Sequence, residues 1–183
     1  MQTKNEIRRL IKEKREALDK NKKIKLDLQI QSNILSNSKF IEAKKVLFYV
    51  SFKNEVDTIN LIKQSFEQKE IFVPKVNEDE LEIYRIESLD DLEEGAYGIL
   101  EPSNKNQRAK FVEIDLALIP GVAFDLSGHR IGFGKGFYDK LNQNLTCLKV
   151  GLAYNFQIVD NIPAEKHDLP VDLIITENKI INI

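Results

Sequence analysis

The chain has few of the residues on which several protein classes depend. Its 183 residues include one cysteine, Cys147, which excludes a disulfide framework and a cysteine-rich zinc site. Eight glycines and five prolines are too few for a low-complexity chain, and 42% apolar residues are too many for a disordered one. The longest strongly apolar run covers only residues 46–50, far short of the roughly 20 residues that span a bilayer. A globular protein that needs no disulfide or metal for its core remains.

Signals of export and of domain division are also missing. Residues 1–6 lead directly into a charged segment without the apolar core of a secretory signal. The chain shows no internal repeat and no convincing domain boundary, so a single domain over residues 1–183 is expected. The sequence predicts a soluble, cytoplasmic protein with no membrane partner.

Charge is nearly balanced over the whole chain but not along it. The 27 basic and 29 acidic residues give a formal charge of −2. Residues 1–25 hold ten basic and four acidic side chains, a charge of +6, which leaves −8 for the remainder. A basic segment on an acidic body favours a negatively charged partner, either nucleic acid or a polyphosphate. The alternative is that these side chains only form a solvated helix face.

The hydrophobic pattern predicts helices alternating with strands. Apolar residues at helical spacing indicate one helix around residues 7–18 and another over residues 24–35, and Asp57 with Thr58 indicates a third helix start. This order favours an α/β fold with a mostly parallel sheet flanked by helices, in which ligands bind outside the carboxyl ends of the strands. Residues 89–108 are expected to form a long surface connection, and residues 138–141 a short helix. Short β-branched and aromatic runs predict strands at residues 46–50, 71–74, 81–86, 114–119, 148–153, 171–176 and 180–183.

The densest chemical signal follows the strand predicted at residues 114–119. Three alternating glycines, at 132, 134 and 136, allow backbone amides to approach an anion, and the helix expected next adds a partial positive charge at its N-terminus. Arg130 and Lys135 supply full charges for phosphate oxygens. Asp139 supplies a carboxylate for the Mg²⁺ that accompanies a nucleotide. The segment therefore predicts a phosphate-binding loop, although glycine-rich segments are often only turns.

Two familiar phosphate loops do not fit this segment. A Walker A loop places Ser or Thr after its Gly-Lys pair, but Gly136 and Phe137 follow Lys135, so no hydroxyl is available for the metal. A dinucleotide fingerprint needs a third glycine where Phe137 stands.

Residues 120–139 resemble the signature of the 5-formyltetrahydrofolate cyclo-ligase family, also called methenyltetrahydrofolate synthetases. Other segments along nearly the whole chain resemble further motifs of the family in the same order. They are Lys4 with Arg8, residues 55–58, residues 98–102, residues 151–154 and residues 167–172.

The resemblance implies a fold, a reaction and a set of site residues. The fold is an α/β architecture similar to that of sugar-phosphate isomerases and CoA-transferases. The reaction is the ATP- and Mg²⁺-dependent conversion of 5-formyltetrahydrofolate to 5,10-methenyltetrahydrofolate, with ADP and phosphate released after the formyl oxygen is phosphorylated. The implied residues are Arg130, Lys135 and Tyr138 for catalysis; Lys4, Asn5, Glu6, Ile7, Arg8, Arg130, Ile131, Gly132, Phe133, Gly134, Lys135, Gly136, Phe137 and Tyr138 for ATP; Val50, Glu55 and Tyr154 for the folate; and Asp139 and Asp172 for Mg²⁺.

Phosphoryl transfer asks a protein mainly for positioning and charge neutralisation, so a Ser-His-Asp or Cys-His arrangement is not needed. Tyr138 is expected to position the formyl oxygen or a phosphate oxygen, and Glu55 to accept hydrogen bonds from the pterin edge. Phe133 and Phe137 depart from the family pattern, in which many members have Tyr, or Arg at the first position, so only stacking remains there. The chain is expected to act as a monomer.

Each of these residues also has a structural interpretation. Tyr138 suits a core position with a satisfied hydroxyl, Glu55 suits a helix N-terminus, and Asp172 suits a turn. His167 and His129 are the only histidines, which disfavours a histidine metal site.

Two rival functions belong to other classes. The basic first helix could bind nucleic acid, but this region has no aromatic residue to stack on bases before Phe40. A sugar-phosphate isomerase or CoA-transferase-like enzyme would share the fold and need no ATP.

Overall fold

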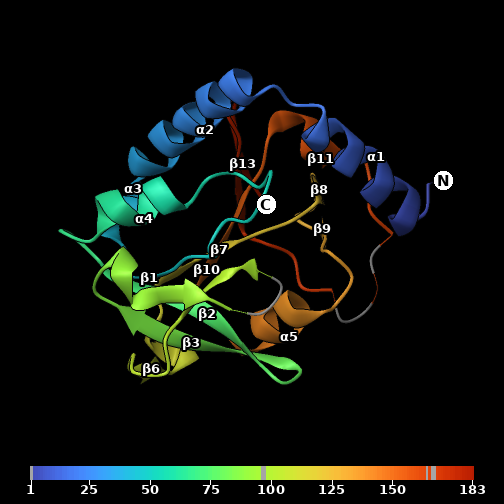
Figure 1. Cartoon of the computed structure of the whole chain (residues 1–183). Coiled ribbons are helices and arrows are strands. Elements are labelled where there is room, and N and C mark those ends of the chain that lie inside the picture. Colours follow the sequence, from blue (N-terminus) through green and yellow to red (C-terminus); the bar gives the residue numbers. More distant parts are fainter. Residues whose placement is uncertain (1, 96–97, 164, 166–167) are drawn as a thin grey trace.

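The computed structural model describes residues 2–95, 98–163, 165 and 168–183. Five α-helices lie in this part of the chain, and several strands assemble into a central sheet (Figure 1). The helices are α1 (Lys4–Glu16), α2 (Lys20–Leu35), α3 (Ser38–Glu42), α4 (Ile59–Ser65) and α5 (Phe137–Asn144). The strands are β1 (Lys45–Leu47), β2 (Glu70–Asn77), β3 (Glu80–Ile86), β4 (Leu92–Glu94), β5 (Leu100–Pro102), β6 (Arg108–Ala109), β7 (Leu116–Ile119), β8 (Ala123–Asp125), β9 (Arg130–Ile131), β10 (Leu148–Leu152), β11 (Ile158–Val159), β12 (Leu173–Ile175) and β13 (Ile180–Asn182).

The central sheet has eight strands in the order β13-β12-β10-β7-β1-β2-β3-β6. The five strands from β12 to β2 run parallel, and β13, β3 and β6 add antiparallel strands at the two edges. Antiparallel pairing of β2 with β3 follows from their short connection, where Glu78 adopts a left-handed φ of 52°. The α/β prediction is confirmed, with the parallel part confined to the middle of the sheet.

Helices cover both faces of this sheet because its inner strands are apolar on both sides. In β1 and the residue after it, Val46 and Phe48 pack with α2, α3 and α4, whereas Leu47 packs on the opposite side with Leu141 of α5. A third, smaller cluster joins α1 to the three-stranded sheet β11-β8-β9.

The position of α1 depends on a well-defined N-terminus and a narrow apolar face. Thr3 and Glu6 form a capping box, with Glu6 N bound to Thr3 Oγ1 at 3.2 Å and Thr3 N bound to Glu6 Oε2 at 2.7 Å. Ile7 and Ile11 are buried against the small sheet, beside β8 and β9 (Figure 1). This packing turns the neighbouring basic residues of α1 toward the body of the molecule.

Two predictions about local structure are wrong. Residues 89–108 are more than a surface connection: they contain β4, β5 and β6, and Glu101 is buried. The segment between β7 and α5 forms the short strands β8 and β9, which pair with each other, and β8 also pairs with β11. Strands of two or three residues are set by their pairing partners, and their own sequences give little signal of them.

Within the described residues, no helix combines the length and the apolar character needed to cross a membrane.

Candidate active site

A cavity of about 630 Å³ lies at the carboxyl ends of the central parallel strands. Tyr49 and Val50, after β1, and Pro120, after β7, form part of its wall. This is the place where open α/β sheets bind ligands. Much of the remaining wall comes from three segments: α1, the turn at residues 52–55 and the glycine segment, which we define as residues 130–139. Residues of β2, β3 and β5 also contribute to it.

One face of α1 presents a row of basic residues to the cavity. Lys4, Arg8, Lys12 and Arg15 lie four, four and three residues apart, a spacing that keeps them on one side of a helix, and all four line the cavity. Arg8 Nε donates to the Gly132 carbonyl oxygen at 2.9 Å, which ties this row to the glycine segment.

This row differs from the five ATP contacts that the resemblance implied in α1. Lys4 and Arg8 line the cavity, but Glu6 caps the helix and Ile7 is buried in the core. Asn5 is exposed and accepts a hydrogen bond from Arg8 Nη1. The sequence interpretation missed Lys12 and Arg15, although the helical spacing that pairs Lys4 with Arg8 leads directly to them.

The glycine segment needs its glycines for backbone conformation. Gly134 and Gly136 have φ angles of +105° and +72°, and a Cβ atom at either position would contact nothing within 4 Å. Substitution would therefore strain the backbone without any clash. Lys135 lies between them, is exposed and lines the cavity.

An exposed aromatic ring connects this segment to α1. Phe133 is 52% exposed, with Lys12 Nζ 5.4 Å and the Arg15 guanidinium 5.7 Å from its ring centroid. These distances are typical of cation–π contacts. Two residues of the basic row thus lie over the one aromatic side chain that the glycine segment exposes to solvent.

Arg130 is a buried charge in the wall of the cavity. Its Nη2 donates to Asp139 Oδ1 at 2.6 Å, and its guanidinium lies 5.8 Å from the Tyr138 ring centroid. Its Nε has no hydrogen-bond partner among the described residues. Burial lowers the pKa of Arg130, and the charges of Asp139 and Asp168 oppose this effect. The side chain keeps its charge and, among the described residues, has one donor without a partner in the wall of the cavity.

In the cavity wall, the charge of Glu55 affects the pKa of Tyr138. Burial raises the pKa of Tyr138, the negative charge of Glu55 raises it further, and Arg130 opposes both. Tyr138 therefore stays protonated and can donate a hydrogen bond. Burial also raises the pKa of Glu55. Two effects lower this pKa in part: the Phe52 backbone amide donates to Oε2 at 2.8 Å, and the positive charge of Arg15 favours the carboxylate.

The predicted folate contacts divide into two groups. Val50 and Glu55 line the cavity, but Tyr154 does not. Tyr154 is completely buried, its hydroxyl donates to Asp27 Oδ1 at 2.7 Å, and its ring stacks on Phe156 with centroids 5.4 Å apart. The expected contact of Tyr154 with the folate does not fit this arrangement, because the chain turns inward after β10.

The two predicted metal ligands are not brought together. Asp139 lines the cavity, whereas Asp172 immediately precedes β12, at the amino end of the parallel strands, where its carboxylate accepts from Lys149 N at 2.7 Å. One Mg²⁺ shared by Asp139 and Asp172 does not fit this geometry. The described residues also hold no cluster of three or more candidate ligand side chains.

Two other carboxylates line the cavity together with Asp139. Asp168 and Glu165 line the cavity, and Lys4 Nζ lies 2.7 Å from Asp168 Oδ2 and 3.1 Å from Glu165 Oε1. Asp168 belongs to the motif at residues 167–172, so the resemblance indicated this segment, although the aspartate of the motif that lines the cavity is Asp168 and not Asp172. His167 of the same motif lies outside the described residues.

Known proteins similar to this chain share its fold as well as its sequence. Residues 1–177 match the sequence model of the 5-formyltetrahydrofolate cyclo-ligase family. A 5-formyltetrahydrofolate cyclo-ligase of Saccharomyces cerevisiae is 33% identical over 96% of this chain and 95% of its own length.

Two solved structures are similar over nearly their full length. The NMR structure of Aquifex aeolicus 5,10-methenyltetrahydrofolate synthetase has a TM-score of 0.90 and 39% identity, and covers 98% of this chain and 92% of its own. The Mycoplasma pneumoniae 5,10-methenyltetrahydrofolate synthetase has a TM-score of 0.77 and 31% identity, and covers 96% of this chain and 99% of its own. Sequence, fold and the glycine segment agree that this chain belongs to the 5-formyltetrahydrofolate cyclo-ligase family.

Proposed function

We propose that this chain converts 5-formyltetrahydrofolate to 5,10-methenyltetrahydrofolate with ATP and Mg²⁺, releasing ADP and phosphate. The observation that carries the proposal is that one cavity is lined both by the glycine segment with its basic residues and by the turn that bears Glu55. A volume of about 630 Å³ is within the range of small-molecule sites. Two substrates can therefore meet in a single cavity.

The phosphate end of the cavity is suited to a nucleotide triphosphate. Arg8, Lys12 and Lys135 line it together with the buried Arg130. The unpartnered Nε of Arg130 adds a fixed donor, and charge-assisted hydrogen bonds to phosphate are about twice as strong as neutral ones. Phe133 offers a ring face for stacking of a base.

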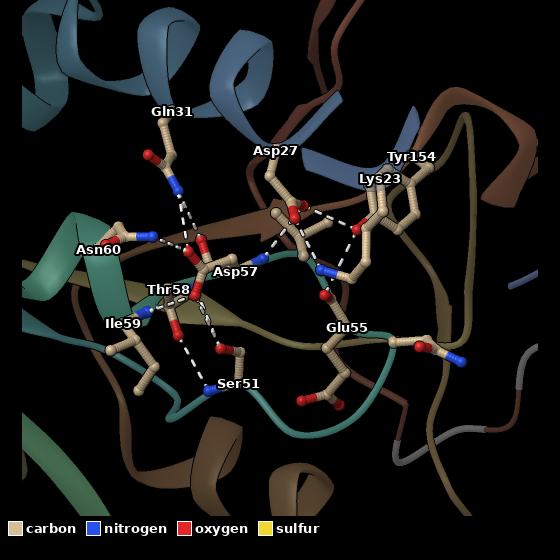
Figure 2. A network of polar contacts seen from close by, with 12 residues as sticks. Lys23, Asp27, Gln31, Ser51, Glu55, Asp57, Thr58, Ile59, Asn60 and Tyr154 are labelled. Carbon is tan, nitrogen blue, oxygen red and sulfur yellow. Dashed lines mark hydrogen bonds and ion pairs between the residues drawn. The ribbon is translucent and has the colours of Figure 1, made fainter. Parts of the chain in front are cut away.

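The part of the wall around the Glu55 turn is suited to the folate. A pterin presents adjacent N–H donors, and the Glu55 carboxylate is an acceptor for two of them. Val50 and Phe52 add apolar and aromatic surface beside it. The carboxylate of Glu55 points away from the polar residues behind its turn (Figure 2).

The chemistry begins at the formyl oxygen, which attacks the γ-phosphorus of ATP as the bond to ADP breaks. The resulting phosphorylated iminium carbon is attacked by the second nitrogen of the substrate, which closes the ring. Phosphate then leaves with the former formyl oxygen, and that nitrogen releases its proton to solvent. Arg130 and Lys135 would stabilise the transferring group, and protonated Tyr138 would donate to the formyl or a phosphate oxygen.

Mg²⁺ takes one or two carboxylates and completes its shell with phosphate oxygens and water. Asp139 and Asp168 fit this need, because both line the cavity and both act electrostatically on Arg130. When bound, the ion would neutralise phosphate charge. Asp172 lies at the other end of the parallel strands and does not fit.

Nucleic-acid binding is less well supported than nucleotide binding. Lys4, Arg8 and Lys12 are half-buried and line the cavity, so they do not form an open basic surface that could follow a phosphate backbone.

The test is near-ultraviolet absorbance after the protein is mixed with ATP, Mg²⁺ and 5-formyltetrahydrofolate, because the methenyl product has an extended chromophore. We expect product formation that stops when ATP is omitted or when a chelator removes the metal. Turnover that continues without ATP and without the metal would contradict the proposal and favour an isomerase-like or transferase-like enzyme.

A further inference from the structure

The turn that carries Glu55 is held from behind by buried polar side chains. Residues 51–58 follow β1 and contain no helix or strand, and several of their backbone groups find partners in side chains (Figure 2). Some of these side chains belong to the segment itself, and the others come from Tyr49, α1, α2 and the residues after β10. An irregular segment of this kind takes its shape from those partners.

Asp27 of α2 is the centre of this network. The residue is only 5% exposed, and its Oδ1 accepts hydrogen bonds from Asp57 N at 3.2 Å and from the Tyr154 hydroxyl at 2.7 Å. Its Oδ2 accepts from Lys23 Nζ at 2.7 Å, which balances its charge. One carboxylate thus connects α2, the turn and the end of β10.

Tyr154 continues the connection to Glu55 itself. Its hydroxyl also lies 3.4 Å from the Glu55 carbonyl oxygen, at the outer limit of a hydrogen bond. The next two anchors flank this point: Arg15 Nε donates to the Asn54 carbonyl oxygen at 2.9 Å, and Gln31 Nε2 donates to the Asp57 carbonyl oxygen at 3.2 Å. The backbone on both sides of Glu55 is therefore fixed by side chains from other elements.

We propose that Asp27 and Tyr154 form a positioning pair, which holds the Glu55 turn so that its carboxylate lies where the folate needs it. The inference rests on the proposed function. Neither residue lines the cavity, so both act through the backbone of the turn. The pair also explains how Tyr154 can serve the folate site, as the sequence led us to expect, without touching the substrate.

The test compares Tyr154→Phe, which removes only the hydroxyl, with the parent protein by steady-state kinetics. We expect the KM for 5-formyltetrahydrofolate to rise by about tenfold, since a hydrogen bond to a charged group is lost. The KM for ATP and kcat at saturation should stay within about twofold. Asp27→Asn keeps the size and one acceptor oxygen, and should change the same KM in the same direction. It supplies the same test if Tyr154→Phe does not fold.

A double-mutant cycle with Glu55→Ala separates positioning from general stability. If the pair acts through Glu55, Tyr154→Phe should change the folate KM by less than about twofold once the carboxylate is gone. Effects that multiply in the double variant, or equal losses for both substrates, would overturn the inference. Tyr84→Phe is the matched control, because the Tyr84 hydroxyl also donates to a carboxylate, that of Glu82, at 2.7 Å outside the cavity.

The parent protein separates this inference from the proposed function. Absence of turnover and of 5-formyltetrahydrofolate binding by calorimetry would refute the proposed function. An active parent with an unchanged folate KM in Tyr154→Phe would refute the positioning pair alone.

Discussion

The burial of Glu55 at the cavity lowers the stability of the folded protein. Burial raises the pKa of its carboxyl group, because the charged form has left water, and the Phe52 amide and Arg15 only partly offset this. The unfolded chain has the lower pKa, so ionisation of Glu55 begins to favour unfolding as pH rises above that lower value, and the effect is complete above the raised pKa. A bound ligand that donates hydrogen bonds to this carboxylate offsets the loss of stability. Binding residues commonly lower the stability of the free protein in this way.

The variant Glu55→Gln should therefore be more stable than the parent protein but bind the folate more weakly. At neutral pH we expect a higher melting temperature than in the parent. The difference should shrink as pH falls below the raised pKa and vanish below the ordinary pKa of the unfolded chain, where Glu55 is neutral in both states. The KM for 5-formyltetrahydrofolate should rise by about tenfold or more because a charged acceptor is lost. Thermal unfolding and initial rates measured across pH check both parts. A variant that is less stable at neutral pH would contradict this account of Glu55.

The acidic residues near the glycine segment permit a matched comparison of metal ligands. Asp139→Asn and Asp168→Asn should each raise the Mg²⁺ concentration needed for half-maximal rate, while Asp172→Asn should leave it unchanged. Mg²⁺ titrations of the rate at saturating ATP measure this. A shift in Asp139→Asn and Asp172→Asn, with none in Asp168→Asn, would restore the ligand pair that the resemblance implied and would exclude Asp168.

At the scale of elements, α1 is both a structural and a binding helix. Its narrow apolar face, with Ile7 and Ile11, packs on the small sheet, and the basic row beside that face is thereby turned into the cavity. A helix with a wide apolar stripe would leave no room for this row. The same element places its remaining charges, such as Arg9 and Lys14, in solvent.

The two faces of α1 should respond differently to charge reversal. Arg8→Glu with Lys12→Glu should weaken ATP binding by at least about tenfold, because each charge-assisted contact to phosphate contributes roughly 1.5–3 kcal/mol. The control is Arg9→Glu with Lys14→Glu on the exposed face, which makes the same change in net charge. ATP titrations by calorimetry compare the pairs. Equal losses would mean that only the overall field of the helix matters.

At the scale of the whole molecule, the cavity lies between parts of the chain that are far apart in sequence. Arg8 reaches Gly132, and Lys4 reaches Asp168 and Glu165, so side chains on the cavity wall link α1 to the glycine segment and to the residues before β12. A polyphosphate bound between these segments would add links of the same kind.

ATP with Mg²⁺ should therefore stabilise the fold and protect α1. At a ligand concentration 100 times the Kd, linkage adds about 2.7 kcal/mol, which corresponds to roughly 5–10 °C in Tm for a chain of this size. Hydrogen exchange should slow in α1 and in the glycine segment, and change little in β1 and β7. AMP, which lacks the terminal phosphates, is the control and should do much less. Equal protection by AMP would mean that the adenosine part, and not the phosphates, accounts for the effect.

The sequence by itself determined the features that depend on neighbours along the chain. Periodicity predicted α2 and α4, apolar runs predicted β2, β3, β7 and β10, and the alternating glycines marked the glycine segment that lines the cavity. These features are local, because helix spacing, strand alternation and left-handed glycine conformations are expressed within a few residues. The helical spacing that pairs Lys4 with Arg8 also places Lys12 and Arg15 on the same face of α1.

Only the tertiary structure decided which of the candidate residues meet. Asp168 and Asp172 stand four positions apart, yet one lines the cavity and the other lies at the amino end of the parallel strands. Tyr154 directly follows the strand region, but it turns inward to Asp27, a residue 127 positions away. Such outcomes depend on strand order and on packing between distant segments, and the spacing of residues along the chain carries no information about either.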